Sequence, residues 1–236
     1  MLPKTYCIKA GYRARDTANT IEVDPGDYWT CERIESSMRF QHDVYRLALD
    51  CAERMGSGLR IADVGCGYPS KAKLLQPFAR TLTCFDQPTL ESIVRRDFPT
   101  FDFVSIDLQE PLELDARFDL IVCADVIEHL VDPDPCLAFL RKCLSEHGIL
   151  ILSTPERDIV RGHDCMTSDK VDHVREWNSE EFARYVQSHG LEIVDHLLVP
   201  PEELTIEEQD RIRRSDERRT RRSEGCQVIV ATNVIV

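Results

Sequence analysis

Five short, continuously apolar runs alternate with segments of helical periodicity through the middle of the chain. The runs are Arg60–Val64, Thr81–Phe85, Phe101–Ile106, Phe118–Cys123 and Gly148–Ser153, and the helix-like stretches lie near 70–79, 88–97 and 134–145. Strands that alternate with helices form parallel sheets, and runs apolar at every position are typical of strands buried on both faces. The sequence therefore predicts an α/β fold on a mostly parallel sheet.

Elements on either side extend this pattern. A helix is expected from Arg39 to Met55, where Gly56 and Gly58 end it, and another over Ser179–His189 with Ser179 as its N-cap. The last apolar runs, Leu191–Val199 and Gln227–Val234, predict an antiparallel pair that brings the sheet to seven strands. Between them, residues 200–225 form a charged insertion with seven arginines from Arg211 to Arg222. We expect a solvated helix or loop there, or a flap that captures an anionic substrate.

Charge and cysteine content limit the classes of protein to consider. The chain of 236 residues carries 42 acidic and 29 basic residues and a net charge of −13, which disfavours a dedicated nucleic-acid binder. No apolar run is long enough for a membrane span, and no export signal is recognisable, so a cytoplasmic location is expected. The ten scattered cysteines form no CxxC pair, which predicts reduced, mostly buried thiols and no structural zinc site.

The most informative motif is IADVGCG, residues 61–67. An apolar strand reaches Asp63, and Gly65 and Gly67 then turn the chain toward the next helix. Ligands of open α/β sheets bind beyond the carboxyl ends of the strands, where glycines allow close approach of the backbone. By itself this motif also fits a nucleotide-binding dehydrogenase.

Acidic residues at the ends of the following strands narrow the choice of ligand. Asp86 ends the second strand, Asp107 and Leu108 follow the third, and Asp125 follows the fourth. These acids suit the hydroxyls of a ribose, an adenine amine and a cationic sulfonium. They suit a pyrophosphate poorly, because phosphate sites use helix N-termini and basic groups.

As a set, DVGCG, Asp86, Ile106-Asp107-Leu108, FDLIVCADVIEHL and GILILSTP resemble the class I S-adenosylmethionine-dependent methyltransferases, over about residues 45–199. The resemblance implies a Rossmann-like fold and S-adenosylmethionine as cofactor. It implies that Asp63, Gly65 and Gly67 line the methionine part, Asp86 the ribose, and Asp107 with Leu108 the adenine. We add Gln87, Ala124 and Asp125 to the expected cofactor-binding residues. Pro69 stands where the family usually has a third glycine, so the turn after Gly67 must differ. The resemblance also makes residues 1–38 a lid or acceptor segment, with Arg13, Tyr28 and Trp29 toward the acceptor, before a cofactor domain at 39–236.

The candidate catalytic residues are Glu128, His129 and His173. If a helix starts at Asp125, then Asp125, Glu128 and His129 share one face, and His129 is suited to act as a base toward a hydroxyl acceptor. A structural role for Glu128 and His129 is an equal alternative.

Two interpretations of the Asp-His-Val-Arg-Glu-Trp segment at 172–177 remain open. In one, Asp125, Glu128, His129 and His173 hold a divalent metal, as in the small-RNA 3′-end 2′-O-methyltransferases that these motifs resemble. In the other, the segment closes the acceptor pocket without metal; together with STPERDIVRG, it resembles a bacterial methyltransferase group associated with glycan and sugar-metabolite assembly. We favour the second and commit to no metal ligands.

The expected function is therefore O-methylation of a sugar-containing or other hydroxylated small molecule or glycan. The alternatives are metal-assisted 2′-O-methylation of an RNA end, and a non-catalytic methyltransferase-like binding module, against which the retained Asp63, Asp86 and Asp107 argue. A homodimer is left open.

Overall fold

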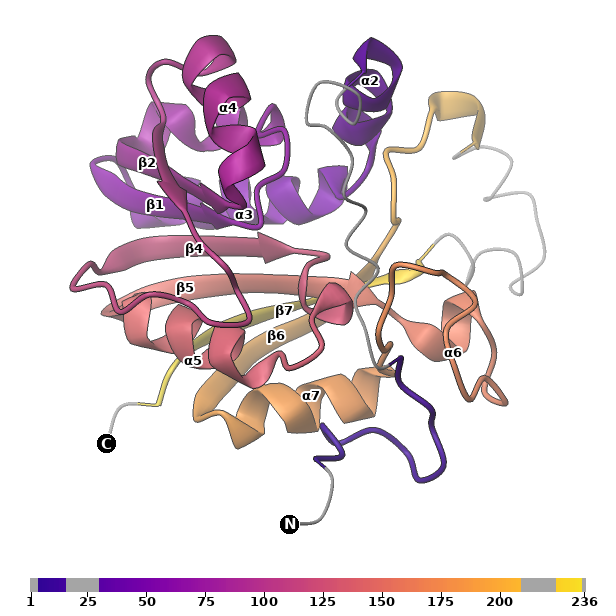
Figure 1. Ribbon diagram of the computed structural model, residues 1–236. Helices are drawn as coiled ribbons and strands as arrows, with labels where there is room; N and C mark the ends of the chain where they lie inside the picture. Colours follow the sequence, from indigo (N-terminus) through magenta and orange to yellow (C-terminus); the bar gives the residue numbers. More distant parts are fainter. Residues whose placement is uncertain (1–3, 16–29, 209–223, 235–236) are drawn as a thin grey trace.

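The computed structural model describes residues 4–15, 30–208 and 224–234 of the chain. Its centre is a seven-stranded sheet in the order β3-β2-β1-β4-β5-β7-β6, in which β7 runs antiparallel to both of its neighbours (Figure 1). The strands are β1 (Leu59–Val64), β2 (Ala79–Asp86), β3 (Asp102–Ser105), β4 (Phe118–Ala124), β5 (Leu144–Pro155), β6 (Leu191–Val199) and β7 (Cys226–Asn233). The predicted α/β class, the seven strands and the final antiparallel pair are confirmed.

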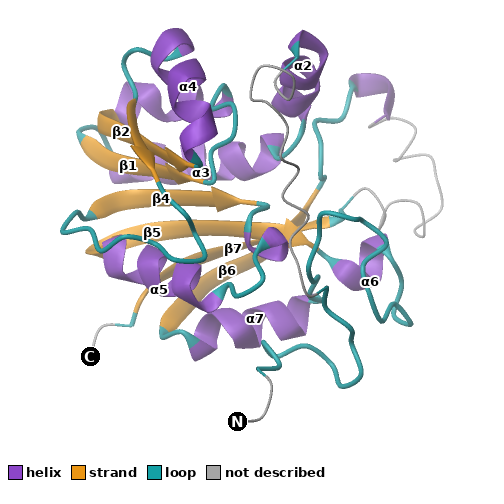
Figure 2. Cartoon of the chain, viewed as in Figure 1, coloured by secondary structure: helices purple, strands orange, loops and turns teal. Residues whose placement is uncertain are grey.

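Helices and 3-10 turns surround this sheet, and some of them cover its two faces (Figure 2). They are α2 (Cys31–Arg39), α3 (His42–Met55), η1 (Lys71–Phe78), η2 (Pro88–Leu90), α4 (Glu91–Asp97), η3 (Ile127–His129), α5 (Asp134–Cys143), α6 (Arg157–Val160) and α7 (Ser179–Ser188). Side chains of α3, η1 and α4 pack on one face, and those of α5 and α7 on the other. Successive residues of β1 supply both cores: Ile61 faces the first and Ala62 the second, which explains why the run is apolar throughout.

Three local expectations differ in detail from the structure. The helix expected from Arg39 to Met55 is α3, which begins at His42, after Gln41 in a left-handed conformation (φ 56°) separates it from α2. The cap of α7 is Asn178 rather than Ser179: its side chain accepts a hydrogen bond from the amide of Glu181, and Glu181 reciprocates, in a capping box. The segment near 70–79 is a 3-10 run that contains Pro77.

Other expectations are met or lie outside the described residues. The nine cysteines whose side chains are described are free thiols, and seven of them are buried. Among the described helices, none combines the length and the apolar content that a membrane span requires. The arginines from Arg211 to Arg222, together with Tyr28 and Trp29, lie outside the described residues. Helix α2 crosses the expected boundary at residues 38 and 39, and the lid itself stays a prediction.

The glycine turn after β1 is fixed by its surroundings. Gly65 has φ +70°, and a β-carbon placed there would lie 2.4 Å from Cγ2 of Val126, in the loop after β4. The amide of Gly65 donates to the carbonyl of Phe85 at 2.8 Å. The turn is therefore held between the ends of β2 and β4, with no room for a side chain.

We predict that Gly65→Ala destabilises the protein more than Gly58→Ala does. Both glycines have positive φ, which costs a residue with a β-carbon about 1–2 kcal/mol, but Gly58 faces open space. Each kcal/mol lowers the Tm by about 2–4 °C in a chain of this size. Thermal unfolding measures the difference, and adding Val126→Ala should recover part of the loss at Gly65. Equal Tm losses in the two single variants would contradict the steric argument.

Candidate active site

The expected cofactor residues gather at one edge of the sheet. Parallel pairing sets Val64 beside Phe85, Asp86 beside Ser105 and Ala124 beside Ser153, so the strands end together. The residues at this edge are Asp63, Gly65, Gly67, Asp86, Gln87, Asp107, Leu108, Ala124 and Asp125. The geometry brings them together as the sequence led us to expect.

Asp86 links the second strand to the glycine turn. Its carboxylate accepts hydrogen bonds from the amides of Gly67 at 2.8 Å and Gln87 at 2.7 Å. Burial raises the pKa of this carboxyl, and the two amide donors oppose the rise. Each oxygen keeps a further lone pair, so the same group that braces the turn can also accept hydrogen bonds from hydroxyls of a ligand.

Asp107 and Leu108, the two residues that follow the third strand, differ in their exposure. Asp107 is exposed and accepts a hydrogen bond from the amide of Gln109 at 2.9 Å, within a turn. Leu108 is 9% exposed and packs in the core on the α5 side of the sheet. Asp107 can therefore approach a ligand directly, whereas Leu108 offers little surface.

Asp63 is buried, and its hydrogen-bond partner was not anticipated. The hydroxyl of Tyr45, on α3, donates to both carboxylate oxygens, at 2.8 and 3.0 Å. Burial raises the pKa of Asp63 to about 7, although the hydrogen bond from Tyr45 and the charge of Lys71 oppose the rise. Nothing in the spacing of Tyr45 and Asp63 along the sequence signals this contact.

This pKa predicts a pH-dependent stability that Asp63→Asn should remove. The carboxyl ionises near its ordinary value of 3.8 when unfolded but near 7 when folded. The contribution of the protonated Asp63 carboxyl to the free energy of unfolding is therefore full below pH 3.8, and it is lost as the pH rises to about 7. Without cofactor, the Tm of Asp63→Asn minus the Tm of the native protein should therefore be larger at pH 8 than at pH 4.5. Thermal unfolding at the two pH values measures this difference.

Asp119→Asn is the matched control with the opposite sign. The Arg60 guanidinium donates to the carboxylate of Asp119 and lowers its pKa, although burial opposes it. That contribution is present at pH 7 and is lost as the pH falls, so Asp119→Asn should lose Tm at neutral pH. If the Tm of the native protein and the Tm of Asp63→Asn changed in parallel with pH, the raised pKa of Asp63 would be refuted.

The helix expected to start at Asp125 does not form. Asp125 has φ 52°, and the chain then makes only the 3-10 turn η3 before α5 begins at Asp134. The side chain of Asp125 accepts a hydrogen bond from Ser153 Oγ at 2.6 Å. Because of this left-handed residue, Asp125 does not join the group formed by Glu128, His129 and His173.

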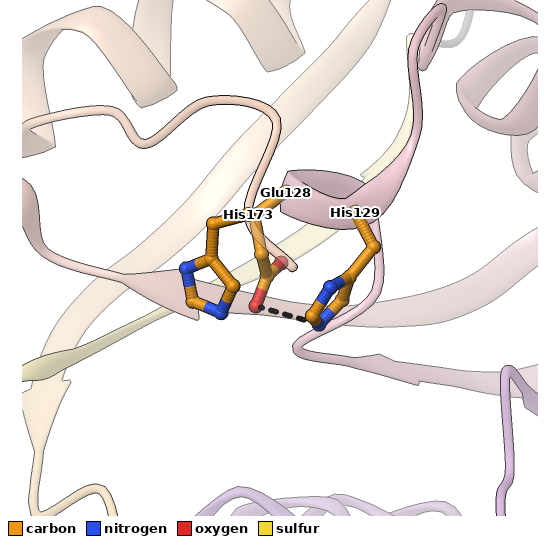
Figure 3. A group of neighbouring side chains, drawn as sticks. All are labelled: Glu128, His129 and His173. Carbon is orange, nitrogen blue, oxygen red and sulfur yellow. Dashed lines mark ion pairs between the residues drawn. The ribbon is translucent and has the colours of Figure 1, made fainter. Parts of the chain in front are cut away.

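Those three catalytic candidates do lie together (Figure 3). One potential ligand atom of each lies within 4.8 Å of the others, and His129 Nε2 is 3.9 Å from Glu128 Oε1. Glu128 and His173 are 0% and 1% exposed, and the side chain of His129 is 35% exposed. Burial, followed by the charge of Asp125, raises the pKa of Glu128 well above its usual range. Burial and the neighbouring His173 lower the pKa of His129.

Backbone hydrogen bonds join the loop that carries His173 to the turn that carries Glu128. The carbonyl of Glu128 accepts from the amides of Val174 at 2.7 Å and Arg175 at 3.3 Å. The guanidinium of Arg175 donates to the carbonyls of Leu130 and Val131 at 2.8 and 2.6 Å. Four bonds thus fix the two halves of the cluster against each other.

A buried ionic network supports the same loop. His173 and Glu176 lie in the segment that the sequence analysis singled out, whereas Arg157, Arg161 and Glu181 were not among the candidate site residues. Glu176 accepts from His173 Nδ1 and from Arg161, at 2.6 and 3.0 Å. Although burial opposes it, these two partners lower the pKa of Glu176 to about 2. Arg157, 0% exposed, pairs with Glu181 of α7. The sequence feature that could have indicated this network is the presence of charged residues next to apolar ones within PERDIVR and VREW.

The N-terminal segment closes over this loop. The carbonyl of Tyr6 accepts from Trp177 Nε1 at 2.8 Å, and the hydroxyl of Tyr12 accepts from the amide of Glu176 at 3.1 Å. The amide of Arg13 donates to the carbonyl of Met166 at 2.8 Å, while its side chain is exposed. Residues 4–15 thus brace the loop from outside.

Comparison with known proteins identifies the family. The family model described as a methyltransferase domain matches residues 38–196. A probable S-adenosylmethionine-dependent methyltransferase of Mycolicibacterium smegmatis is 32% identical over 66% of this chain and 60% of its own length. A ubiquinone biosynthesis O-methyltransferase of Actinobacillus pleuropneumoniae is 27% identical over 50% of this chain and 56% of its own length. The chain thus spans less than two thirds of these relatives.

A solved structure agrees in fold. The N-methyltransferase NodS of Bradyrhizobium japonicum, in complex with S-adenosylhomocysteine, superposes with a TM-score of 0.66 at 16% identity, over 94% of this chain and 100% of that one. The protein belongs to the class I S-adenosylmethionine-dependent methyltransferase superfamily. Within it, the chain is a member of the methyltransferase-domain family that the model describes.

Proposed function

We propose that the protein transfers the methyl group of S-adenosylmethionine to a hydroxyl of a sugar-containing or other hydroxylated small molecule. The observation that carries this proposal is the group Glu128, His129 and His173 beside the expected cofactor edge. Glu128 follows β4 by a few residues, and its Oε2 accepts a hydrogen bond from Thr154 of β5 at 3.1 Å. Hydroxyls need activation before they attack a methyl group, and imidazole and carboxylate groups can supply it.

The cofactor would lie along the carboxyl edge of the sheet. Asp63, Gly65 and Gly67 would surround its methionine part, Asp86 its ribose and Asp107 its adenine amine, with Gln87, Ala124 and Asp125 completing the site. The exposure of these acids supports the proposal: Asp107 is exposed and Asp86 half-buried, so both carboxylates can meet donors of a bound ligand. Leu108 would contribute through the small part of its surface that is accessible.

The reaction needs alignment more than covalent help from the protein. The acceptor oxygen attacks the methyl carbon, the carbon–sulfur bond breaks, and its electron pair stays on sulfur to give S-adenosylhomocysteine. The hydroxyl proton would pass to the imidazole of His129, whose side chain is 35% exposed, and from there to solvent. Holding oxygen, carbon and sulfur in line supplies much of the remaining rate enhancement.

Transfer to an RNA 3′ end is the second candidate, since the same three residues would face a terminal ribose. The net charge of −13 disfavours it, because binding to a phosphate backbone depends on basic residues.

Transfer to oxygen also agrees with the name of the ubiquinone O-methyltransferase relative, whereas the structural neighbour NodS is named an N-methyltransferase.

The cofactor assignment predicts that Asp86→Asn weakens binding of S-adenosylmethionine at least tenfold, because an amide accepts fewer hydrogen bonds from the ribose than a carboxylate. Calorimetric titration measures the change. Asp102→Asn is the matched control, since Asp102 is exposed at the opposite end of β3. An unchanged affinity in Asp86→Asn would remove the ribose assignment.

The acceptor class is tested by transfer of a radiolabelled methyl group into a fractionated cell extract. We expect label in the small-metabolite or glycan fraction, because the acidic chain disfavours polyanions. Label confined to RNA would replace the leading proposal with the second candidate. Label in protein alone would contradict both.

A further inference from the structure

A hollow of about 730 Å³ lies at the edge of the sheet opposite the expected cofactor edge (Figure 1). Its walls come from the starts of β4, β5 and β6, the end of the antiparallel β7, and the last turns of α5 and α7. Sites for small molecules typically have volumes of about 300–1,000 Å³. The proposed methyl transfer uses no residue of this hollow.

The hollow is basic although the chain as a whole is acidic. Arg117, Arg141 and Lys142 line it, and none of its described lining residues is an aspartate or a glutamate. His189 lines it too, but its Nε2 already lies 3.3 Å from the carboxylate of Asp134, so we do not count it as a free cation. Over the full chain, 42 acidic residues outnumber 29 basic ones. Three cations gathered on one concave surface favour an anionic ligand.

Two of the three cations are not neutralised by neighbouring carboxylates. Neither Arg117 nor Arg141 forms an ion pair within the described residues. Lys142 pairs with Glu113 at 2.8 Å, but the side chain of Glu113 is 91% exposed, and ion pairs at such surface positions are weak. Burial raises the pKa of the Cys143 thiol, and the charges of Arg117 and Lys142 both oppose the rise. The two charges therefore act on the same small region.

A glycine determines where the guanidinium of Arg141 lies. Gly190, in the turn between α7 and β6, has φ +74°, and a β-carbon there would lie 3.0 Å from Cζ of Arg141 and 3.1 Å from its Nη1. The guanidinium thus rests directly on the backbone of this turn, which a side chain would prevent. Because α5 carries Arg141 and the turn supports it, the charge is held at the wall of the hollow.

Asn233, at the end of β7, adds an acceptor to the same wall. Its Nδ2 donates a hydrogen bond to the carbonyl of Leu144 at 3.3 Å. Its Oδ1 is buried and has no hydrogen-bond partner in the described part of the chain. A buried acceptor without a partner is costly, and a hydroxyl of a bound ligand would remove that cost.

We propose that this hollow binds a phosphorylated small molecule that also carries hydroxyl groups, such as a sugar phosphate. Guanidinium groups bind phosphate oxygens through paired hydrogen bonds, and the ammonium of Lys142 adds a point charge. A concave site of this volume suits a small molecule better than the flat surface of a membrane.

The ligand of the hollow is distinct from the methyl acceptor. The seven residues of β4 separate the hollow from the expected cofactor edge. At the usual rise of a strand, this separation is about 20 Å, too far for a small molecule to reach the reacting methyl group. The inference therefore concerns a second site and does not rest on the proposed function.

The test is calorimetric titration of the full chain with ribose 5-phosphate and with inorganic pyrophosphate. Excess S-adenosylhomocysteine is present, so that the cofactor edge is occupied. We expect one ligand per chain and an affinity about tenfold weaker in Arg117→Gln and in Arg141→Gln, because each removes a charged hydrogen-bond donor. Both arginines are exposed, so these variants should fold. Asn233→Ala should weaken ribose 5-phosphate about threefold and leave pyrophosphate, which lacks the hydroxyls, unchanged.

Arg54→Gln is the matched control. Arg54 lies in the last turn of α3 as Arg141 lies in the last turn of α5, so both substitutions remove a favourable charge from the end of a helix. Arg54 does not line the hollow, so its substitution should leave the affinity for both probes unchanged.

Several outcomes would overturn the site. They are failure of both probes to bind the native chain, equal affinities in the native protein and Arg141→Gln, and equal losses in Arg54→Gln and Arg141→Gln. Binding that S-adenosylhomocysteine abolishes would assign the probes to the cofactor edge instead. Binding to vesicles of anionic phospholipid, without binding of either soluble probe, would replace the small molecule with a membrane surface. None of these measurements involves methyl transfer, so the result is independent of the acceptor.

Discussion

The parallel pairing of β1 with both β2 and β4 is the constraint on which the site depends. Because these strands run in the same direction, their carboxyl ends meet at one edge of the sheet. The glycine turn after β1, Asp86 after β2 and the turn after β4 become neighbours there although they are far apart in sequence. The contact between Gly65 and Val126, and the bond from the Gly67 amide to Asp86, then lock the edge.

A second level of organisation comes from backbone hydrogen bonds instead of side-chain packing. The carbonyl of Glu128 holds the amides of Val174 and Arg175, and the carbonyl of Asp172 orients the ring of His129. The same few residues thus position a loop and select the tautomer of an imidazole. The ionic pairs of Arg161 with Glu176 and of Arg157 with Glu181 connect this loop to α6 and α7.

Much of the fold could be predicted from the sequence, because strands buried on both faces leave uninterrupted apolar runs. The edge at which the strands end together followed from the same pattern, since strand ends are visible as the positions where acids replace apolar residues. The left-handed residues Gln41 and Asp125 could not be foreseen, because neither is a glycine and their conformations depend on tertiary contacts. The grouping of Glu128 with His129 and His173 was anticipated as a motif, but the exclusion of Asp125 required the geometry of its turn.

The contacts of residues 4–15 have a consequence for the order in which the molecule assembles. Tyr6 and Tyr12 bond to Trp177 and Glu176, partners more than 160 positions away along the chain. Contacts of such sequence separation form late, because the entropy of closing a long loop has to be overcome first. Residues 4–15 can make these bonds only after the loop that carries His173 has formed. We therefore expect residues 4–15 to dock late in folding, onto a loop that the carbonyl of Glu128 already holds.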